Sequence, residues 1–359
     1  MVVALDAMGG DFAPKNPVAG ALAALDQFSN LEVILVGREN EIKAELKAAG
    51  RERESRLRIE DAPDVIEMTD SPGKVIRSKP NSSLLRAVEL HRDRVADAIV
   101  SAGHTGVQMA ASYMKLGLVE GVRRPTIGGL FPVGKGRFTL MLDVGANTDC
   151  KPINLLQFAV MGSIYMKIMM KVDNPSVGLL SIGEEKTKGN ELVLATHYLL
   201  ENSGLNFLGN IEGRDLLIGK ADVIVCDGFV GNVVLKLAES LTHLIMTHIF
   251  GPDSSEDASD SKLHERLKML RRDFDYSEIG GVPLLGVDGL SIICHGGSSG
   301  KAIKNAIREA IMLSEGNLAN ELSEGIKLYD AGMLARGVAR FRGFHDKKDE
   351  FEVTEEDDD

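Results

Sequence analysis

The chain has 359 residues, of which 44% are hydrophobic and 26% charged, and its formal net charge is −12. This composition is typical of a globular protein with a large core or two lobes, and the acidic balance argues against nucleic acid as a partner. The three cysteines, Cys150, Cys226 and Cys294, are too few and too scattered for a disulfide framework or a metal knuckle. They fit a reducing cytoplasm.

Short apolar runs alternate with helical patterns along the chain. In the first half we expect a strand at 2–6, a helix at 17–28, a strand at 31–36, helices at 39–49 and 82–94, a strand at 98–101, a helix at 105–115, and a hairpin of strands 126–131 and 138–143. In the second half we expect a helix at 152–170, a strand at 177–181, a helix at 190–201, strands at 206–210 and 223–226, a helix at 229–250, a strand at 290–294, and helices at 299–322 and 325–342. The alternation predicts an α/β fold, in which a mostly parallel sheet lies between helices on both faces in an α/β/α sandwich.

No internal repeat or convincing linker divides the chain, so we expect a single two-lobed domain over residues 1–343. A polar insert at 251–261 interrupts two helical stretches. The acidic tail at 344–359 is expected to be solvated and disordered. The apolar stretch at 158–172 contains two lysines and is too short and too interrupted to span a bilayer.

Glycine-rich or polar turns follow many of the predicted strands, at 6–11, 101–106, 143–147, 181–183, 227–232 and 295–299. In open α/β sheets, ligands bind outside the carboxyl ends of the strands, often at helix N-termini whose N–H groups face an anion. We therefore expect one wide composite cleft for an oxyanion and a larger group beside it. The candidate residues for binding substrate or phosphate are Asp6, Gly9, Gly10, Asp11, Ser101, His104, Thr105, Gly106, Asp143, Asn147, Asp227, His295 and Ser298.

Two common nucleotide-binding signatures are missing from this sequence. No G-x-G-x-x-G motif follows the first strand. The segment 295–302 superficially resembles a P-loop, but His295 occupies the first glycine position and Ala302 replaces the Ser or Thr that would hold magnesium. The segment therefore does not indicate a Walker motif.

Two side chains in these turns are candidates for catalysis. Lys188 lies in a loop between a strand and a helix; alone, this loop would be an ordinary solvated one, but beside the other turns its lysine can bind phosphate. Asn232 falls on the first turn of a predicted helix, where its amide can donate to a developing oxyanion. Asp227, just before that helix, can also be a simple N-cap.

His295 and Cys294 are adjacent at the end of a predicted strand. A core histidine is a common alternative, but the Gly-Gly-Ser-Ser sequence that follows His295 favours a position facing the cleft. Neighbouring strand residues point to opposite faces, which argues against a Cys–His nucleophilic pair.

The motifs taken together resemble the bacterial phosphate acyltransferase (PlsX) family, the acyl-carrier-protein:phosphate transacylases of phospholipid synthesis. The resemblance runs in family order over residues 1–325, and among its stretches are ALDAMGGDFAPK (4–15), SAGHTG (101–106), LDVGAN (142–147), GLLSIGEEKTKGNEL (178–192) and ADVIVCDGFVGNVVLK (221–236). The family usually has Asn where this chain has His104, and a histidine side chain titrates near neutral pH, so the role of this position is open.

This resemblance implies a homodimer with the architecture shared by phosphotransacetylase and isocitrate or isopropylmalate dehydrogenases. It implies transfer of a long acyl group from an acyl carrier protein thioester to inorganic phosphate, without metal or organic cofactor and without an acyl-enzyme. The acyl-phosphate would pass to a glycerol-3-phosphate acyltransferase. The catalytic lysine and asparagine of the family fall on Lys188 and Asn232.

The family resemblance also implies peripheral contact with membranes. Apolar residues recur at helical spacing in 230–250 and in 263–274, where basic residues lie beside them. These stripes favour weak docking of the helix tips on lipid, with packing against each other or across a dimer as the alternative for most of the residues.

Two other functions are considered. A dehydrogenase of the same architecture would need aspartates that bind a divalent metal and a nicotinamide site, and the sequence shows no such constellation. A lysine and an asparagine in adjacent cleft turns argue against a non-catalytic scaffold that binds acyl groups or the carrier protein. An activity assay decides between such a scaffold and an acyltransferase.

Overall fold

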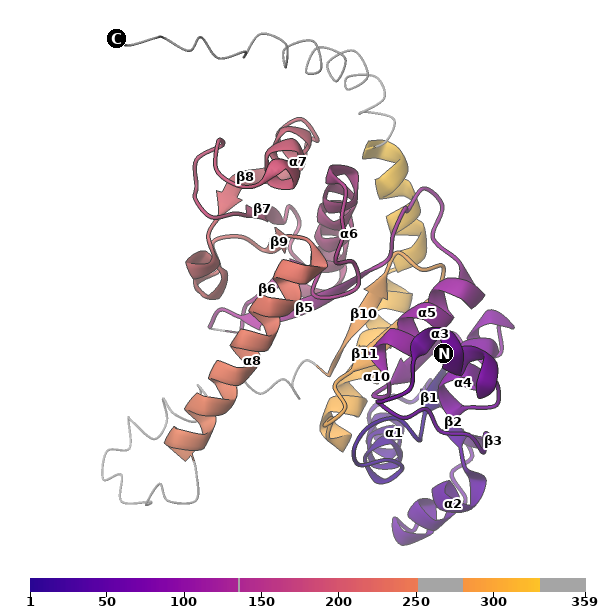
Figure 1. Ribbon diagram of the computed structural model, residues 1–359. Helices are drawn as coiled ribbons and strands as arrows, with labels where there is room; N and C mark the ends of the chain where they lie inside the picture. Colours follow the sequence, from indigo (N-terminus) through magenta and orange to yellow (C-terminus); the bar gives the residue numbers. More distant parts are fainter. Residues whose placement is uncertain (135, 251–279, 330–359) are drawn as a thin grey trace, which may run out of the picture.

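Figure 1 shows the computed structural model, which describes residues 1–134, 136–250 and 280–329. The predicted insert at 251–261, the acidic tail at 344–359 and the apolar stripe at 263–274 lie outside these residues. So does most of the helix predicted at 325–342. The domain limit at 343 stays a prediction.

The described residues form a single mixed sheet of 11 strands in the order β3-β2-β1-β4-β11-β10-β5-β6-β9-β7-β8. The first lobe contains the parallel strands β3 (Leu57–Asp61), β2 (Glu32–Gly37), β1 (Val2–Asp6), β4 (Ala98–Ser101) and β11 (Ser291–Cys294). The second lobe contains the parallel strands β6 (Phe138–Leu142), β9 (Val223–Val225), β7 (Ser176–Leu180) and β8 (Asn206–Ile211). Strands β10 (Gly281–Leu285) and β5 (Thr126–Pro132) join the lobes. The predicted α/β class and the β5–β6 hairpin are confirmed.

The strands of the two lobes run in opposite directions. β10 is antiparallel to both β11 and β5, and β5 is antiparallel to β6. Following these pairings across the sheet, β6, β9, β7 and β8 run opposite to β1, β4 and β11. The strands of the two lobes therefore have their carboxyl ends on opposite sides of the sheet. The side on which the strands of a lobe end is called its carboxyl edge.

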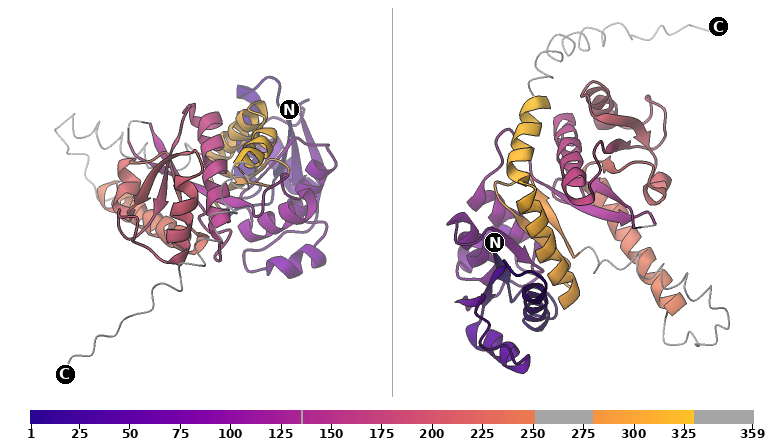
Figure 2. Two further views of the ribbon diagram at one scale, coloured as in Figure 1. Left: turned by 90° about the horizontal axis from the view of Figure 1, so that it is seen from above. Right: turned by 180° about the vertical axis from the view of Figure 1, so that it is seen from behind.

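Helices cover both faces of this sheet, as predicted (Figures 1 and 2). One face carries α1 (Lys15–Gln27), α10 (Gly300–Glu315), α6 (Pro152–Met170) and α7 (Glu191–Glu201), whose apolar side chains join a core that is continuous across both lobes. The other face has two separate cores. α4 (Ser83–Arg92) and α5 (Thr105–Leu116) cover one of them, and α8 (Gly228–Phe250) and η1 (Gly213–Ile218) cover the other.

Several elements differ from the sequence-based prediction. The sequence did not predict the strands β3 and β10 or the helices α3 (Pro72–Ser78) and η1. Helix α2 (Glu39–Ala48) corresponds to the helix predicted at 39–49. β3 has no fully buried residue, and its alternation of Leu57 and Ile59 with charged residues spans only four positions, which is a weak strand signal. The helix predicted at 299–322 is broken at 316–317, where Asn317 takes a φ of 51°, and residues 318–329 are again helical.

Helix α6 is long and apolar enough to cross a membrane by length and composition. In the structure 67% of its most apolar window is buried, and residues such as Phe158, Met161 and Tyr165 lie in the shared core. Pro152 occupies its first turn, and Asn154 Oδ1 accepts a hydrogen bond from the Lys151 N–H at 2.8 Å. The helix therefore has the contacts of a central packing element between the lobes.

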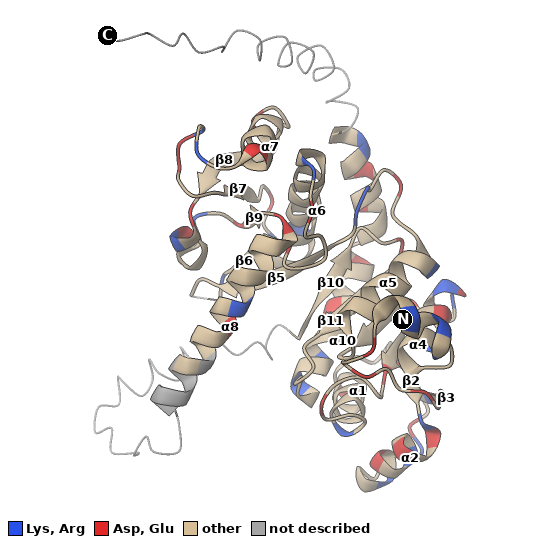
Figure 3. Cartoon of the chain, in the orientation of Figure 1, with Lys and Arg blue, Asp and Glu red and all other residues tan. Residues whose placement is uncertain are grey.

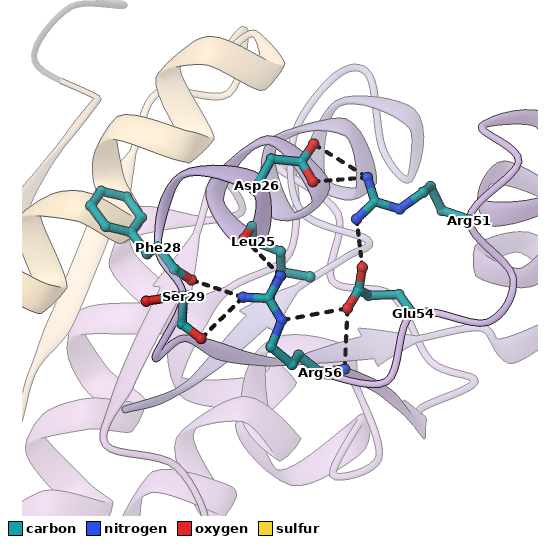
Figure 4. Close-up of polar contacts among 7 residues, drawn as sticks. All are labelled: Leu25, Asp26, Phe28, Ser29, Arg51, Glu54 and Arg56. Carbon is teal, nitrogen blue, oxygen red and sulfur yellow. Dashed lines mark hydrogen bonds and ion pairs between the residues drawn. The ribbon is translucent and has the colours of Figure 1, made fainter.

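A polar network holds the outer edge of the first lobe (Figure 4). The Arg56 guanidinium donates to the carbonyl oxygens of Leu25 and Phe28 at the end of α1, at 2.8 and 2.9 Å. Arg51 bridges Asp26 and Glu54, and its hydrogen bond to Glu54 is the main cause that lowers the pKa of that carboxyl. Arg56 thus satisfies carbonyl groups that the end of a helix leaves without intrahelical partners.

Charged residues are spread over many of the helices and turns (Figure 3), and Glu309 of α10 is one of the few that are buried. Its side chain lies in the core between α10 and α6, where the Tyr165 hydroxyl donates to Glu309 Oε1 at 2.7 Å. Loss of hydration on burial raises the pKa of Glu309 to about 8.

We expect the stability of the protein to fall with rising pH because of Glu309. A carboxyl whose pKa is raised in the folded state holds its proton more tightly there, so stability is lost as the pH rises from about 4.5 to about 8. Glu309→Gln should therefore gain up to about 5 kcal/mol over the wild type between pH 5 and 8.5. Denaturant unfolding at both pH values measures this difference. Glu315 is an exposed carboxyl on the same helix, so Glu315→Gln should show no such gain. If the free energy of unfolding of the two variants depended on pH in the same way, the raised pKa of Glu309 would be refuted.

Candidate active site

In the first lobe, the turns after β1 and β4 are joined by the buried carboxylate of Asp6. Ser101 Oγ donates to Asp6 Oδ2 at 2.6 Å, and the Met8 N–H donates to Oδ1 at 3.2 Å. Ser101 Oγ in turn accepts from the Gly103 N–H at 2.9 Å. Burial raises the pKa of Asp6 above its ordinary value, although these hydrogen bonds oppose the shift.

The turn after β11 packs against the turn after β1. The Asp11 N–H donates to the Gly296 carbonyl at 2.9 Å. Gly10 has a φ of 99°, and a Cβ there would lie 2.8 Å from the same carbonyl oxygen, so a side chain cannot be accommodated at this position. A Cβ on Gly9 would likewise lie 2.5 Å from Asp6 Oδ2.

Among the residues that the structure describes, five buried side-chain atoms have no hydrogen-bond partner, and two of them lie in turns at the carboxyl edge of the first lobe. They are the hydroxyl of Ser298 and Nδ1 of His104, which precedes Thr105 and Gly106 in the first turn of α5. His295 is exposed, and its Nδ1 accepts from the Gly297 N–H at 3.1 Å. His295 is therefore not a core histidine, which was the alternative interpretation of its position in the sequence. Unsatisfied buried polar groups are costly unless a ligand or water completes them, so these two groups make this edge a candidate binding surface.

In the second lobe, Asp143 organises the turn after β6. Its fully buried carboxylate accepts from the backbone N–H groups of Gly145, Ala146 and Asn147, the last at 2.6 Å, and from the Asn147 side chain at 2.8 Å. The Ile127 N–H also donates to it, at 3.3 Å. Burial raises the pKa of Asp143, while these donors oppose the shift.

The first turn of α8 packs directly on the Asp143 turn. The Gly228 N–H donates to the Asn147 carbonyl at 2.7 Å, and a Cβ on Gly231 would lie 1.8 Å from the Asp143 carbonyl oxygen. Asn232 is exposed, and its Oδ1 lies 3.4 Å from the position of a Cβ on Gly145. Asp227 Oδ1 accepts from the Val230 N–H at 3.0 Å, so this residue caps the helix, as the simpler interpretation has it.

Lys188 follows β7, the neighbour of β9 in the sheet, so it leaves the second lobe at the same edge as Asp227. Its exposed side chain passes over Gly183, where a Cβ would lie 3.0 Å from Lys188 Cγ. Within the described residues its ammonium has no ion pair, whereas the nearby Lys186 pairs with Glu201 and Lys220 pairs with Glu184. Lys188 is therefore a cation available to an anionic ligand.

The predicted residues thus fall into two groups. Asp143, Asn147, Asp227, Asn232 and Lys188 gather at the carboxyl edge of the second lobe; the others gather at the carboxyl edge of the first. The expectation of one composite cleft rested on a common carboxyl edge, and the sheet of this chain has no such edge because its two halves run in opposite directions. Gly231 and Asn210, which contact the turns of the second lobe, were not predicted.

Across the described residues, no cluster of three or more His, Cys, Asp or Glu side chains is arranged to hold a metal ion. Burial raises the pKa of Cys150 to about 11 and also raises the pKa values of Cys226 and Cys294. Cys294 packs in the shared core, whereas His295 is exposed, so the two do not form a nucleophilic pair.

Known proteins resemble this chain in sequence and in fold. The family described as "Fatty acid synthesis protein" matches residues 1–321. A phosphate acyltransferase from Pelotomaculum thermopropionicum is 49% identical over 336 residues, which cover 91% of this chain and 95% of the relative. One from Heliobacterium modesticaldum is 47% identical and covers 91% of this chain and 98% of the relative. The crystal structure of a phosphotransacetylase from Streptococcus pyogenes aligns with a TM-score of 0.59 at 18% identity, covering 87% of this chain and 94% of that one.

The structural match shows that the chain has the α/β fold of the phosphotransacetylases. The sequence matches narrow this class to one family, because the relatives are 47–49% identical over nearly the whole chain. The chain belongs to the phosphate acyltransferase (PlsX) family.

We expect Gly231→Ala to disrupt the second lobe, because its Cβ would overlap the Asp143 carbonyl oxygen. The free energy of unfolding should fall by at least about 2 kcal/mol, and turnover should fall as the α8 turn moves. Gly213→Ala is the control, since a Cβ there meets nothing within 4 Å and the change should stay within about 1 kcal/mol. Thermal and denaturant unfolding measure both. Equal stability of the two variants would contradict the packing described.

Proposed function

The chain is an acyltransferase of its family, and we propose that it transfers a long-chain acyl group from an acyl carrier protein thioester to inorganic phosphate. One observation carries the proposal. Lys188, a cation without an ion pair in the described structure, and the exposed amide of Asn232 follow neighbouring strands at the same edge of the second lobe. A cation and an amide donor suit a reaction between an anionic nucleophile and a carbonyl group.

In the proposed mechanism, a phosphate oxygen held by Lys188 attacks the thioester carbonyl carbon. The Asn232 amide donates a hydrogen bond to the carbonyl oxygen, which becomes negative in the tetrahedral intermediate. The carbon–sulfur bond then breaks, the carbonyl re-forms as acyl-phosphate, and the carrier thiolate leaves with the electron pair and takes a proton from water. The three cysteines take no part, and no acyl-enzyme forms.

The first-lobe residues have a supporting role in this proposal. The turns that carry Asp6, Gly10, Asp11, His104 and Ser298 present backbone N–H groups and two unsatisfied side-chain atoms, which suit an anionic part of a substrate. The oligomeric state of the protein decides which second-lobe edge these turns face. It can be the edge of the same chain or that of a second copy. We propose a homodimer.

An exposed apolar stripe on α8 supports an assembly of this kind. Its apolar side chains Val233, Leu237, Leu241 and Leu244 are 46–59% exposed and recur at helical spacing. A stripe of this kind is expected to be covered in the working protein. We propose that most of it packs in the homodimer, and that the far tip of the helix docks weakly and peripherally on a membrane, where a downstream glycerol-3-phosphate acyltransferase would use the product.

The direct test is to incubate the purified protein with palmitoyl-acyl carrier protein and phosphate and to detect acyl-phosphate by mass spectrometry. Acyl-phosphate should form without added metal or organic cofactor. Binding of the acyl carrier protein without turnover would instead support the scaffold function, and the proposal would then be wrong.

Variants of the two catalytic residues should separate their roles. Lys188→Ala should lower turnover by about 100-fold or more with the fold preserved, because an exposed charge is lost from the transition state. Asn232→Ala should lower kcat with a smaller effect on KM for the thioester. Steady-state kinetics measures both, and Lys186→Ala, in the same loop, is the control with little expected change. Near-wild-type turnover of Lys188→Ala would refute its assigned role.

Membrane docking is tested by flotation with anionic liposomes at low ionic strength. The wild type should float weakly, and flotation should decrease with added salt because screening weakens contact between charges. Ile249→Glu combined with Phe250→Glu at the end of α8 should abolish flotation. Lack of flotation by the wild type, or unchanged flotation by the double variant, would argue against docking.

A further inference from the structure

The loop that carries Lys188 rests on a buried amide. Asn210 lies near the end of β8 and is 4% exposed. Its side-chain nitrogen donates to the carbonyl oxygen of Glu185 at 2.8 Å and to that of Lys188 at 3.3 Å. The hydroxyl of Ser181 donates to the same Lys188 carbonyl at 3.1 Å. The backbone from Glu185 to Lys188 is therefore held at both ends from the strand below it.

His197 of α7 fixes the orientation of this amide. Its Nδ1 lies 2.9 Å from Asn210 Oδ1, and its ring packs edge-on against Phe207 with centroids 5.1 Å apart. Carbonyl oxygens only accept hydrogen bonds, so the amide nitrogen of Asn210 faces the loop and its oxygen faces His197. It follows that Nδ1 of His197 carries the proton and donates to Asn210. His197 is itself buried, at 6% exposure.

The other contacts of this loop are weaker constraints. The ion pairs Lys186–Glu201 and Glu184–Lys220 lie at the surface, with side chains from 35 to 67% exposed. Exposed ion pairs of this kind contribute little to holding a conformation, because water and salt compete for both partners. The hydrogen bonds of Asn210 start from a buried side chain and are part-buried, so water competes less for them and they fix the loop more firmly.

We propose that Asn210 is a positioning residue for Lys188, and that His197 orients Asn210 for this task. The inference deepens the proposed function and rests on its assignment of Lys188 to phosphate. Asn210 touches no substrate. It sets where the Lys188 side chain begins, and thereby where the ammonium meets the phosphate.

Asn210→Asp and Asn210→Ala test the proposal. The first keeps the shape of the side chain and removes the donor; the second removes the side chain without adding a charge. Both should speed amide hydrogen exchange in the segment 183–189. Both should lower kcat/KM for phosphate by about 10- to 100-fold, with KM for the acyl thioester within about twofold of the wild type, because a shifted catalytic group loses alignment with its reactant. His197→Ala should show the same pattern more weakly.

Asn206→Asp is the matched control. Asn206 lies at the other end of β8, and its amide donates to the Asn174 carbonyl at 3.1 Å, so the same chemical change is made on the same strand away from Lys188. This variant should leave both exchange in 183–189 and phosphate kinetics unchanged. The proposal is overturned if the Asn210 variants exchange like the wild type, if they loosen the loop but keep full turnover, or if Asn206→Asp gives the same losses.

The hydrogen-exchange measurement does not depend on activity, so the two levels of inference can fail separately. If Lys188→Ala retains full activity, the proposed function of Lys188 is wrong, whatever the exchange shows. If Lys188→Ala is inactive and exchange in 183–189 does not respond to Asn210→Ala, only the positioning role is wrong.

Discussion

The arrangement of the whole sheet depends on the short strand β10. It pairs antiparallel on both sides and joins two blocks of parallel strands that would otherwise share no hydrogen bonds. Helix α10 lies tightly across its start, where a Cβ on Gly280 would come within 2.4 Å of the Ala306 nitrogen. This close approach lets α10 continue the shared core from the first lobe toward α6. Because β10 and the β5–β6 hairpin together reverse the strand direction, the two lobes present their carboxyl edges on opposite sides, and the turns with candidate site residues are divided accordingly.

Each edge is built around a buried aspartate. Asp6 is the last residue of β1, and Asp143 directly follows β6. Both lie almost wholly out of water and accept hydrogen bonds from backbone N–H groups of the glycine-rich turns next to them. A buried carboxylate is unfavourable without such donors, and the turns in turn need an acceptor for their N–H groups. The aspartates therefore shape the turns next to them. The proposed mechanism assigns ligand contact to the exposed Lys188 and Asn232, whose turns are held by Asn210 and Asp143 respectively.

This division of roles explains why polar residues of similar type behave differently here. Lys186 and Lys220 are held in surface ion pairs, whereas Lys188 reaches over Gly183 without one in the described part of the chain. The side-chain amides of Asn147 and Asn210 donate to backbone carbonyl groups, whereas Asn232 is exposed on the first turn of α8. Electrostatic stabilisation of a transition state requires donors that are held in place before the reaction, and in the proposed function the buried amide of Asn210 has this task for Lys188.

The sequence by itself determined the fold class, most of the helices and strands, and the turns that carry candidate residues, because these depend on local periodicity and on glycine and proline at strand and helix ends. Its motifs also indicated the family and pointed to Lys188 and Asn232. Only the tertiary structure decided that β3 and β10 belong to the sheet, that the two sets of turns lie at opposite edges, and that Gly231 must be a glycine. It alone revealed Asn210 beneath the Lys188 loop. These features depend on contacts between residues far apart in the chain, such as β10 with β5, Gly231 with Asp143, and Asn210 with Glu185, and no local pattern encodes such pairings.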